Sequence, residues 1–184
     1  MGGGSDSCDG PPMIDSLLLS HSLMMLAAAG AAACAVPEGR RRLIRRWQLL
    51  LPAALAAVAT LLLVAYPSFS ELRRPELWMF ALGATVVGFV RGQFMSLQVD
   101  HAWRVVRLPG VPDGLWMAIV LALLAALEVV RAVDGGVADG FLPTLEFAMV
   151  MVAGYLVGRA IAGWARVRQM PNSELRGPMA APRP

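Results

Sequence analysis

Apolar residues fill five long stretches of the chain, and charged, glycine and proline residues gather in the short segments between them. Apolar runs of this length predict membrane-spanning helices, because about 20 helical residues cross the hydrocarbon core of a bilayer. The third run, 77–90, is short, and it reaches this length only if the helix continues past Arg91, whose long side chain can extend to the headgroups. The predicted spans cover residues 13–36, 48–65, 77–92, 114–130 and 141–165.

In the connection between the third and fourth runs, apolar and polar residues alternate with a period of two. Met95, Leu97 and Val99 alternate with polar residues, which is typical of a half-buried strand. Residues 103–108 then alternate apolar residues with arginines, and a Pro-Gly turn follows. The pattern predicts a short amphipathic hairpin lying against the membrane. The alternative is that residues 91–99 simply continue the third helix.

Together the patterns predict an all-α integral membrane protein with about five transmembrane helices, built as one helical domain over residues 13–165. Residues 1–12 are Gly-rich and acidic, and residues 166–184 are Pro-rich and polar, so both ends are predicted to be disordered. The acidic start also disfavours a cleaved secretory signal, which begins with a positive charge. The composition agrees, because 57% of the residues are hydrophobic but only 7% are aromatic.

The positions of the charged residues predict how the helices are oriented in the membrane. The net charge is +3, and every one of the 16 basic residues is an arginine. These arginines flank apolar helices, so they indicate topology and contact with anionic headgroups, not nucleic-acid binding. Most fall on one side of the five-span arrangement, which predicts an amino terminus outside and a carboxyl terminus in the cytoplasm. The arginines predicted to contact headgroups are Arg40, Arg41, Arg42, Arg45, Arg46, Arg91, Arg104 and Arg107.

Candidate chemistry is limited to polar residues inside apolar runs, since the chain has no familiar catalytic or metal-binding motif. Because charge is costly in lipid, such residues are functional candidates by default. The carboxylates of Asp15, Glu128 and Glu146 could exchange protons or contact cations. The alternative is that they lie solvated in the headgroup zone. The histidine is predicted to be a packing residue, and no metal or cofactor is predicted. The candidates are Asp15, His21, Glu128, Glu146 and Arg159.

Gly154 and Gly158 are separated by three residues in the fifth apolar run. Small residues at this spacing let helix backbones approach closely in lipid. We therefore expect them to form a helix-packing face, within the chain or between chains.

Residues 88–100, Gly-Phe-Val-Arg-Gly-Gln-Phe-Met-Ser-Leu-Gln-Val-Asp, end one apolar helix and lead through an aromatic and basic segment into another. Over about residues 81–128 this arrangement resembles the CcdC-like group of small bacterial integral membrane proteins. That group has a comparable Arg-Gly followed by a short strand-like connection, and its name reflects an association with cytochrome c biogenesis. The resemblance implies an accessory protein of a bacterial inner membrane and assigns no activity to any residue here.

The leading functional hypothesis is a multi-pass inner-membrane accessory or assembly protein without catalytic activity. It would act through helix-packing contacts with a partner membrane protein or a second copy, in a bilayer with anionic headgroups. The alternative is a small transporter or proton-coupled carrier that uses Asp15, Glu128 and Glu146. The chain shows no internal repeat or pair of broken helices of the kind that carriers use, which favours the first hypothesis.

Overall fold

The computed structural model describes residues 13–39, 43–65, 75–100, 105–107, 112–133 and 142–171. It contains the five helices α1 (Met13–Gly39), α2 (Leu51–Ala65), α3 (Pro75–Gln93), α4 (Asp113–Val133) and α5 (Leu142–Gln169). A 3-10 helix, η1 (Arg46–Leu49), precedes α2, and there are three short strands, β1 (Leu43–Arg45), β2 (Gln98–Asp100) and β3 (Val105–Arg107). Within the described residues, four helical segments are long and apolar enough to cross a membrane: Leu19–Glu38, Arg46–Leu63, Asp113–Arg131 and Leu145–Gln169. The remaining helix, α3, does not meet these criteria of length and apolarity.

The helix ends follow the charge pattern of the sequence. Acidic residues lie in the first turns of α3 and α4, and arginines lie in the last turns of α3, α4 and α5. Charges placed in this way interact favourably with the helix dipole. Helix α5 runs four residues beyond the predicted boundary at 165, so the predicted tail begins too early. The reason is Val167, which is only 1% exposed and packs with the apolar residues beneath the strands.

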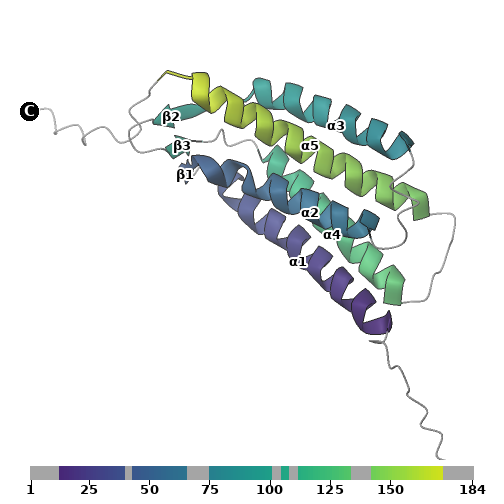
Figure 1. Cartoon of the computed structure of the whole chain (residues 1–184). Coiled ribbons are helices and arrows are strands. Elements are labelled where there is room, and N and C mark those ends of the chain that lie inside the picture. The colour runs from purple at the N-terminus through teal and green to yellow at the C-terminus, as the bar shows by residue number, and fades with distance from the viewer. Residues whose placement is uncertain are drawn as a thin grey trace, which may run out of the picture.

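The helices run side by side, and the three strands lie together at one end of the bundle (Figure 1). We call this end the sheet end and the opposite end the far end. Helix α3 lies along α5, on the side of the bundle away from α1 (Figure 1). The main core is rich in alanine, which allows helices to approach closely where lipid surrounds them. It contains Met24, Ala27, Ala28, Ala35, Ala56, Ala59, Leu63, Ala118, Leu121, Ala125, Met149, Ala153 and Leu156.

The predicted hairpin is present. Strand β2 pairs antiparallel with β3, with Val99 opposite Val106. Met95, Leu97 and Val99 are buried, and the polar residues between them are exposed, as the period-two pattern predicts. Asp100 departs from the pattern because it is also buried, at 3% exposure.

The described residues are mostly helical, in agreement with the predicted fold class. The sheet is larger than the predicted hairpin, because β1 pairs antiparallel with β3 and completes a three-stranded sheet of order β1-β3-β2. The alternative in which the third helix continues to Val99 is excluded, because α3 ends at Gln93. The guanidinium of Arg166 donates hydrogen bonds to the carbonyls of Gly92 and Met95 there, so carbonyls at the end of α3 have a cationic partner.

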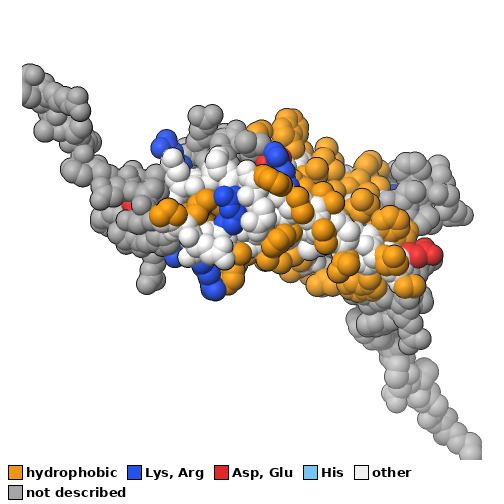
Figure 2. Space-filling model, turned by 90° about the horizontal axis from the view of Figure 1, so that it is seen from above, with side chains coloured by type: hydrophobic (Ala, Val, Ile, Leu, Met, Phe, Trp, Pro, Cys, Tyr) orange, Lys and Arg blue, Asp and Glu red, His pale blue; other side chains and the backbone are white. Residues whose placement is uncertain are grey.

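The surface of the molecule changes character along its length. On the face shown in Figure 2, apolar side chains cover most of the described surface toward the far end, whereas arginines gather toward the sheet end. Large apolar residues on four helices are more than half exposed, including Leu26, Leu61, Leu82 and Leu123. Such a surface is unstable in water and suits a hydrocarbon environment.

Candidate functional site: a charge network at the sheet end

A buried arginine organises the sheet end of the bundle. Arg159, on the inner face of α5, is 9% exposed. Its guanidinium donates a 3.1 Å hydrogen bond to Oε2 of Glu38 in the last turn of α1, and a second nitrogen forms an ion pair with the same carboxylate. The guanidinium also lies 3.3 Å from Oδ1 of Asp113, the first residue of α4. One side chain therefore ties α5 to α1 and α4.

Asp113 extends this network to a fourth helix. Its second carboxylate oxygen accepts a 2.9 Å hydrogen bond from Nε of Arg91, in the last turn of α3. The phenol of Tyr155 lies beside the same arginine and aspartate. Two carboxylates and two guanidiniums thus balance to zero formal charge, which lowers the cost of removing them from water.

Glycines give the network its close geometry. A Cβ on Gly114 would overlap the guanidinium of Arg159 and the carboxylate of Glu38. A Cβ on Gly92 would lie 2.8 Å from the carbonyl oxygen of Arg159 and 2.6 Å from Cβ of Ala162. Any side chain at either position would therefore push α3 or α4 away from α5.

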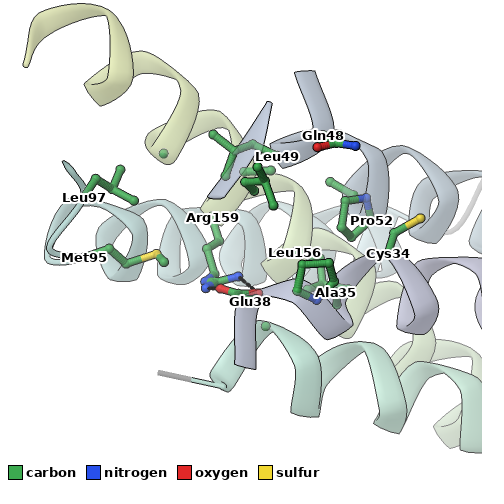
Figure 3. Close-up of a pocket in the computed structure, with 16 residues that line it drawn as sticks. Cys34, Ala35, Glu38, Gln48, Leu49, Pro52, Met95, Leu97, Leu156 and Arg159 are labelled. Atoms are coloured by element: carbon green, nitrogen blue, oxygen red, sulfur yellow. Dashed lines mark hydrogen bonds and ion pairs between the residues drawn. The ribbon is translucent and has the colours of Figure 1, made fainter. Parts of the chain in front are cut away.

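A cavity of about 50 Å³ adjoins the Glu38–Arg159 pair (Figure 3). Cys34 and Leu156 line it from the helix bundle, and Met95 and Leu97 line it from the segment leading into β2. The cavity lies at the junction between the main core and the smaller apolar cluster beneath the sheet, which comprises Met95, Leu97, Val99, Val106 and Val167. We call it the sheet-end cavity.

The arrangement suits positioning better than bond-breaking chemistry. Each carboxylate in the network already has an arginine partner, and no nucleophile with an adjacent base stands in it. Within the described residues, no three His, Cys, Asp or Glu side chains come together as metal ligands. What the network can do is fix the ends of α1, α3 and α4 relative to α5.

A second structural feature is the contact between α3 and α5, which we call the glycine seam. A Cβ on Gly158 would overlap the carbonyl of Thr85, and one on Gly154 would lie 2.7 Å from the carbonyl oxygen of Ala81. From the other helix, a Cβ on Gly88 would overlap the carbonyl of Tyr155. The two glycines predicted to form a packing face therefore lie against α3, within the same chain.

The other predicted site residues are dispersed. Asp15 belongs to α1, but its side chain lies outside the described residues, and His21 is half-buried on the same helix. Glu128 lies 3.5 Å from Arg131, one turn away on α4 near the far end. Glu146 is half-buried near the start of α5. Of the five polar candidates, only Arg159 belongs to the network.

The arginines predicted to contact headgroups lie at the sheet end where they are described. Arg45 on β1 and Arg107 on β3 are exposed, Arg46 is half-buried, and Arg91 is exposed while bound to Asp113. Arg40, Arg41, Arg42 and Arg104 fall outside the described residues. Near the carboxyl end of α5, the guanidinium of Arg168 stacks 3.6 Å from the ring centroid of Trp164.

The sequence reasoning missed Glu38, Asp113 and the small residues that accommodate the network. Neither carboxylate is among the predicted site residues, because Glu38 lies just before the arginine-rich segment 40–46 and Asp113 just before the fourth apolar run. A signal was nevertheless present, because an arginine within an apolar helix needs a carboxylate at the same depth. Glu38 follows the first apolar run and Asp113 precedes the fourth, both on the side of the predicted arrangement where Arg159 lies. Their positions in the sequence could therefore have indicated the pairing.

Comparisons of the chain with protein-family models, curated proteins and solved structures give no match. The resemblance of residues 81–128 to the CcdC-like group therefore stays a prediction from the sequence.

Proposed function

We propose that the protein is a five-span inner-membrane accessory protein with its sheet end in the cytoplasm. Four helical segments have the length and apolarity to cross a bilayer. Helix α3 starts at the far end, where α2 stops, and ends at the sheet end, where α4 begins (Figure 1). If α2 and α4 cross the membrane, α3 must cross it too, and its 19 residues span about 28 Å as a helix. The arginines at the sheet end support a cytoplasmic location for that end.

The accessory role rests on the outward face of α3. This helix packs chiefly against α5 and turns only Leu77, Gly88 and Gly92 inward as buried residues. Most of its large apolar side chains are 39–73% exposed, although Phe80 also contacts Phe147 of α5: Trp78, Met79, Phe80, Leu82, Val86, Val87, Phe89 and Val90. Aromatic residues are enriched in the buried centres of protein interfaces. We propose that a helix of a partner membrane protein covers this face.

The modest apolarity of α3 supports the same proposal. Helix α3 is not among the segments apolar enough to be assigned as a span on composition alone. A helix of this kind is better accommodated between protein neighbours than with one side wholly in lipid. The glycine seam provides one neighbour, α5, and the outward face is left for another.

The carrier hypothesis has less support from the geometry. Its three carboxylates are not the ones that meet in the charge network, and Glu128 is paired with Arg131 on its own helix. The observation that favours a carrier is the buried Glu38–Arg159 pair beside a cavity, because ionisable groups inside a membrane often mark transport pathways. That pair is neutralised and joins the end of α1 to α5, which favours a structural role.

The proposed docking face can be tested by site-specific photo-cross-linking in cells. A photoreactive amino acid in place of Leu82, on the outward face of α3, should give a discrete cross-linked product with one partner protein. The matched control is the same replacement of Leu123 on α4, which is similarly exposed, at 60% against 69% for Leu82. Cross-links to lipid alone at both positions would contradict the proposal, and a product of twice the chain mass would identify the partner as a second copy.

A further inference from the structure

We infer that the sheet-end cavity holds water in contact with Arg159, and that this water makes Cys34 reactive toward polar reagents although it lies in an apolar helix. The inference concerns the sheet end alone and does not depend on the proposed partner of α3.

The first support is an unmet hydrogen-bonding need. Nε of Arg159 is buried, and among the described residues it has no hydrogen-bond partner. Buried polar groups are almost always hydrogen-bonded, to protein or to ordered water. Water in the adjoining cavity would supply an acceptor for this N–H, because Arg159 lines the cavity.

The second support is the volume of the cavity. One water molecule needs roughly 10–15 Å³, counted as the space that the centre of a water-sized sphere can occupy. The sheet-end cavity measures about 50 Å³, so it has room for a few. Gly163 on α5 lines the same space, and a Cβ built there would have no neighbour within 4 Å.

The third support is the chemistry of the wall. Purely apolar cavities stay dry, but a water with several polar partners is held firmly. Three residues with polar side chains, Glu38, Gln48 and Arg159, line the cavity. Glu38 and Arg159 meet on one side of the space, and Leu49 and Pro52 lie across it (Figure 3).

Cys34 reports on this water directly. It is a free cysteine on α1 that lines the cavity, one turn before Glu38. The thiolate is the reactive form of cysteine, and an apolar environment suppresses it. A hydrated cavity therefore permits reaction with a small charged thiol reagent, whereas a dry one does not.

The experiment uses the full-length Cys8→Ser protein in lipid nanodiscs, which expose both faces and remove any dependence on topology. We expect a small cationic methanethiosulfonate reagent to modify Cys34 about tenfold faster than a cysteine in the dry core. The control cysteine is Ala28→Cys combined with Cys34→Ser. Ala28 lies on the same helix and is fully buried in the main core.

Filling the cavity provides the second arm. Gly163→Leu should place its side chain in the free space and slow the modification of Cys34 toward the rate of the core control. Gly83→Leu is the matched control, because a Cβ at Gly83 also meets nothing within 4 Å but lies on the exposed side of α3. Equal rates for Cys34 and the core cysteine, or no slowing in a folded Gly163→Leu protein, would overturn the inference.

Discussion

The two ends of the helix bundle are held together by different interactions. At the sheet end, ion pairs join α1, α4 and α3 through Arg159 and Asp113, and a three-stranded sheet lies over the helix ends. At the far end, α3 and α5 meet through apolar contacts, including the edge-to-face pair of Phe80 and Phe147 with centroids 5.3 Å apart. The ion pair between Glu128 and Arg131 stays within one helix.

The proposed location in a membrane accounts for this difference. Apolar helices gain little from hydrophobic burial when lipid surrounds them, so shape complementarity holds the far end together. Ion pairs cost less to desolvate near the membrane surface than in the hydrocarbon core. There they can fix the relative positions of the helices. Substitutions at the sheet end should therefore have large effects that depend on charge, and those along the glycine seam should depend on size.

The largest effect is expected for Arg159→Met. The change leaves the Glu38 carboxylate buried without a partner, which costs about 3–5 kcal/mol for a buried pair. The free energy of unfolding in detergent should fall by this order, and the amount of protein in the membrane should fall with it. Stability equal to wild type would show that the network does not hold the helices together.

A double variant, and a control variant at the ion pair of the far end, make this test more specific. In Glu38→Leu with Arg159→Met, both charges are replaced by apolar groups of similar size, so a large part of the stability should return. Asp113 keeps Arg91 in that variant. The matched control is Arg131→Ala at the far end, where only a partly exposed pair within α4 is lost and we expect a change of about 1 kcal/mol or less.

The next effect concerns the size of residues in the glycine seam. Gly158→Leu places a side chain where a Cβ would already overlap the carbonyl of Thr85, and overpacking of this kind costs about 1–3 kcal/mol. Gly154→Leu should act in the same way. Both should lower the melting temperature in detergent, whereas Gly83→Leu should not. If all three variants melt like wild type, α3 does not pack on α5 through these glycines.

The smallest effects are expected for Glu128→Gln and Glu146→Gln. Glutamine keeps the size and most of the hydrogen bonding of glutamate, so an accessory protein should tolerate both changes. A proton-coupled carrier that uses these groups would lose its activity. The measurement is complementation of a deletion strain, with the amount of each variant in the membrane checked. Failure of either variant at normal abundance would favour the carrier.

Much of the fold could be predicted from local pattern. Long apolar runs and charged boundaries gave five helices with ends mostly within a few residues of those observed. The period-two alternation at Met95, Leu97 and Val99 gave the hairpin. These signals are local, because each depends on residues close together in the chain.

Features that depend on distant residues could not be predicted in the same way. Strand β1 is only three residues long, and its partner β3 lies about sixty residues later, so no alternation marks it. Glu38 and Arg159 are separated by 121 positions, and they meet because α1 and α5 both pack against α2 and α4. The glycine spacing was visible in α5, but its match with Gly88 and Gly92 in α3 required the helix pair.

The central claim is that the two ends of the bundle face opposite sides of the membrane, with the sheet end in the cytoplasm. Cysteines introduced at Glu76 and Gln98 test it directly, because both positions are exposed and lie at opposite ends of α3 and its following strand. In a Cys8→Ser, Cys34→Ser background, a membrane-impermeant maleimide should label Glu76→Cys in intact cells. It should label Gln98→Cys only after the membrane is permeabilised. Labelling of Gln98→Cys in intact cells, or equal labelling of both, would contradict the account.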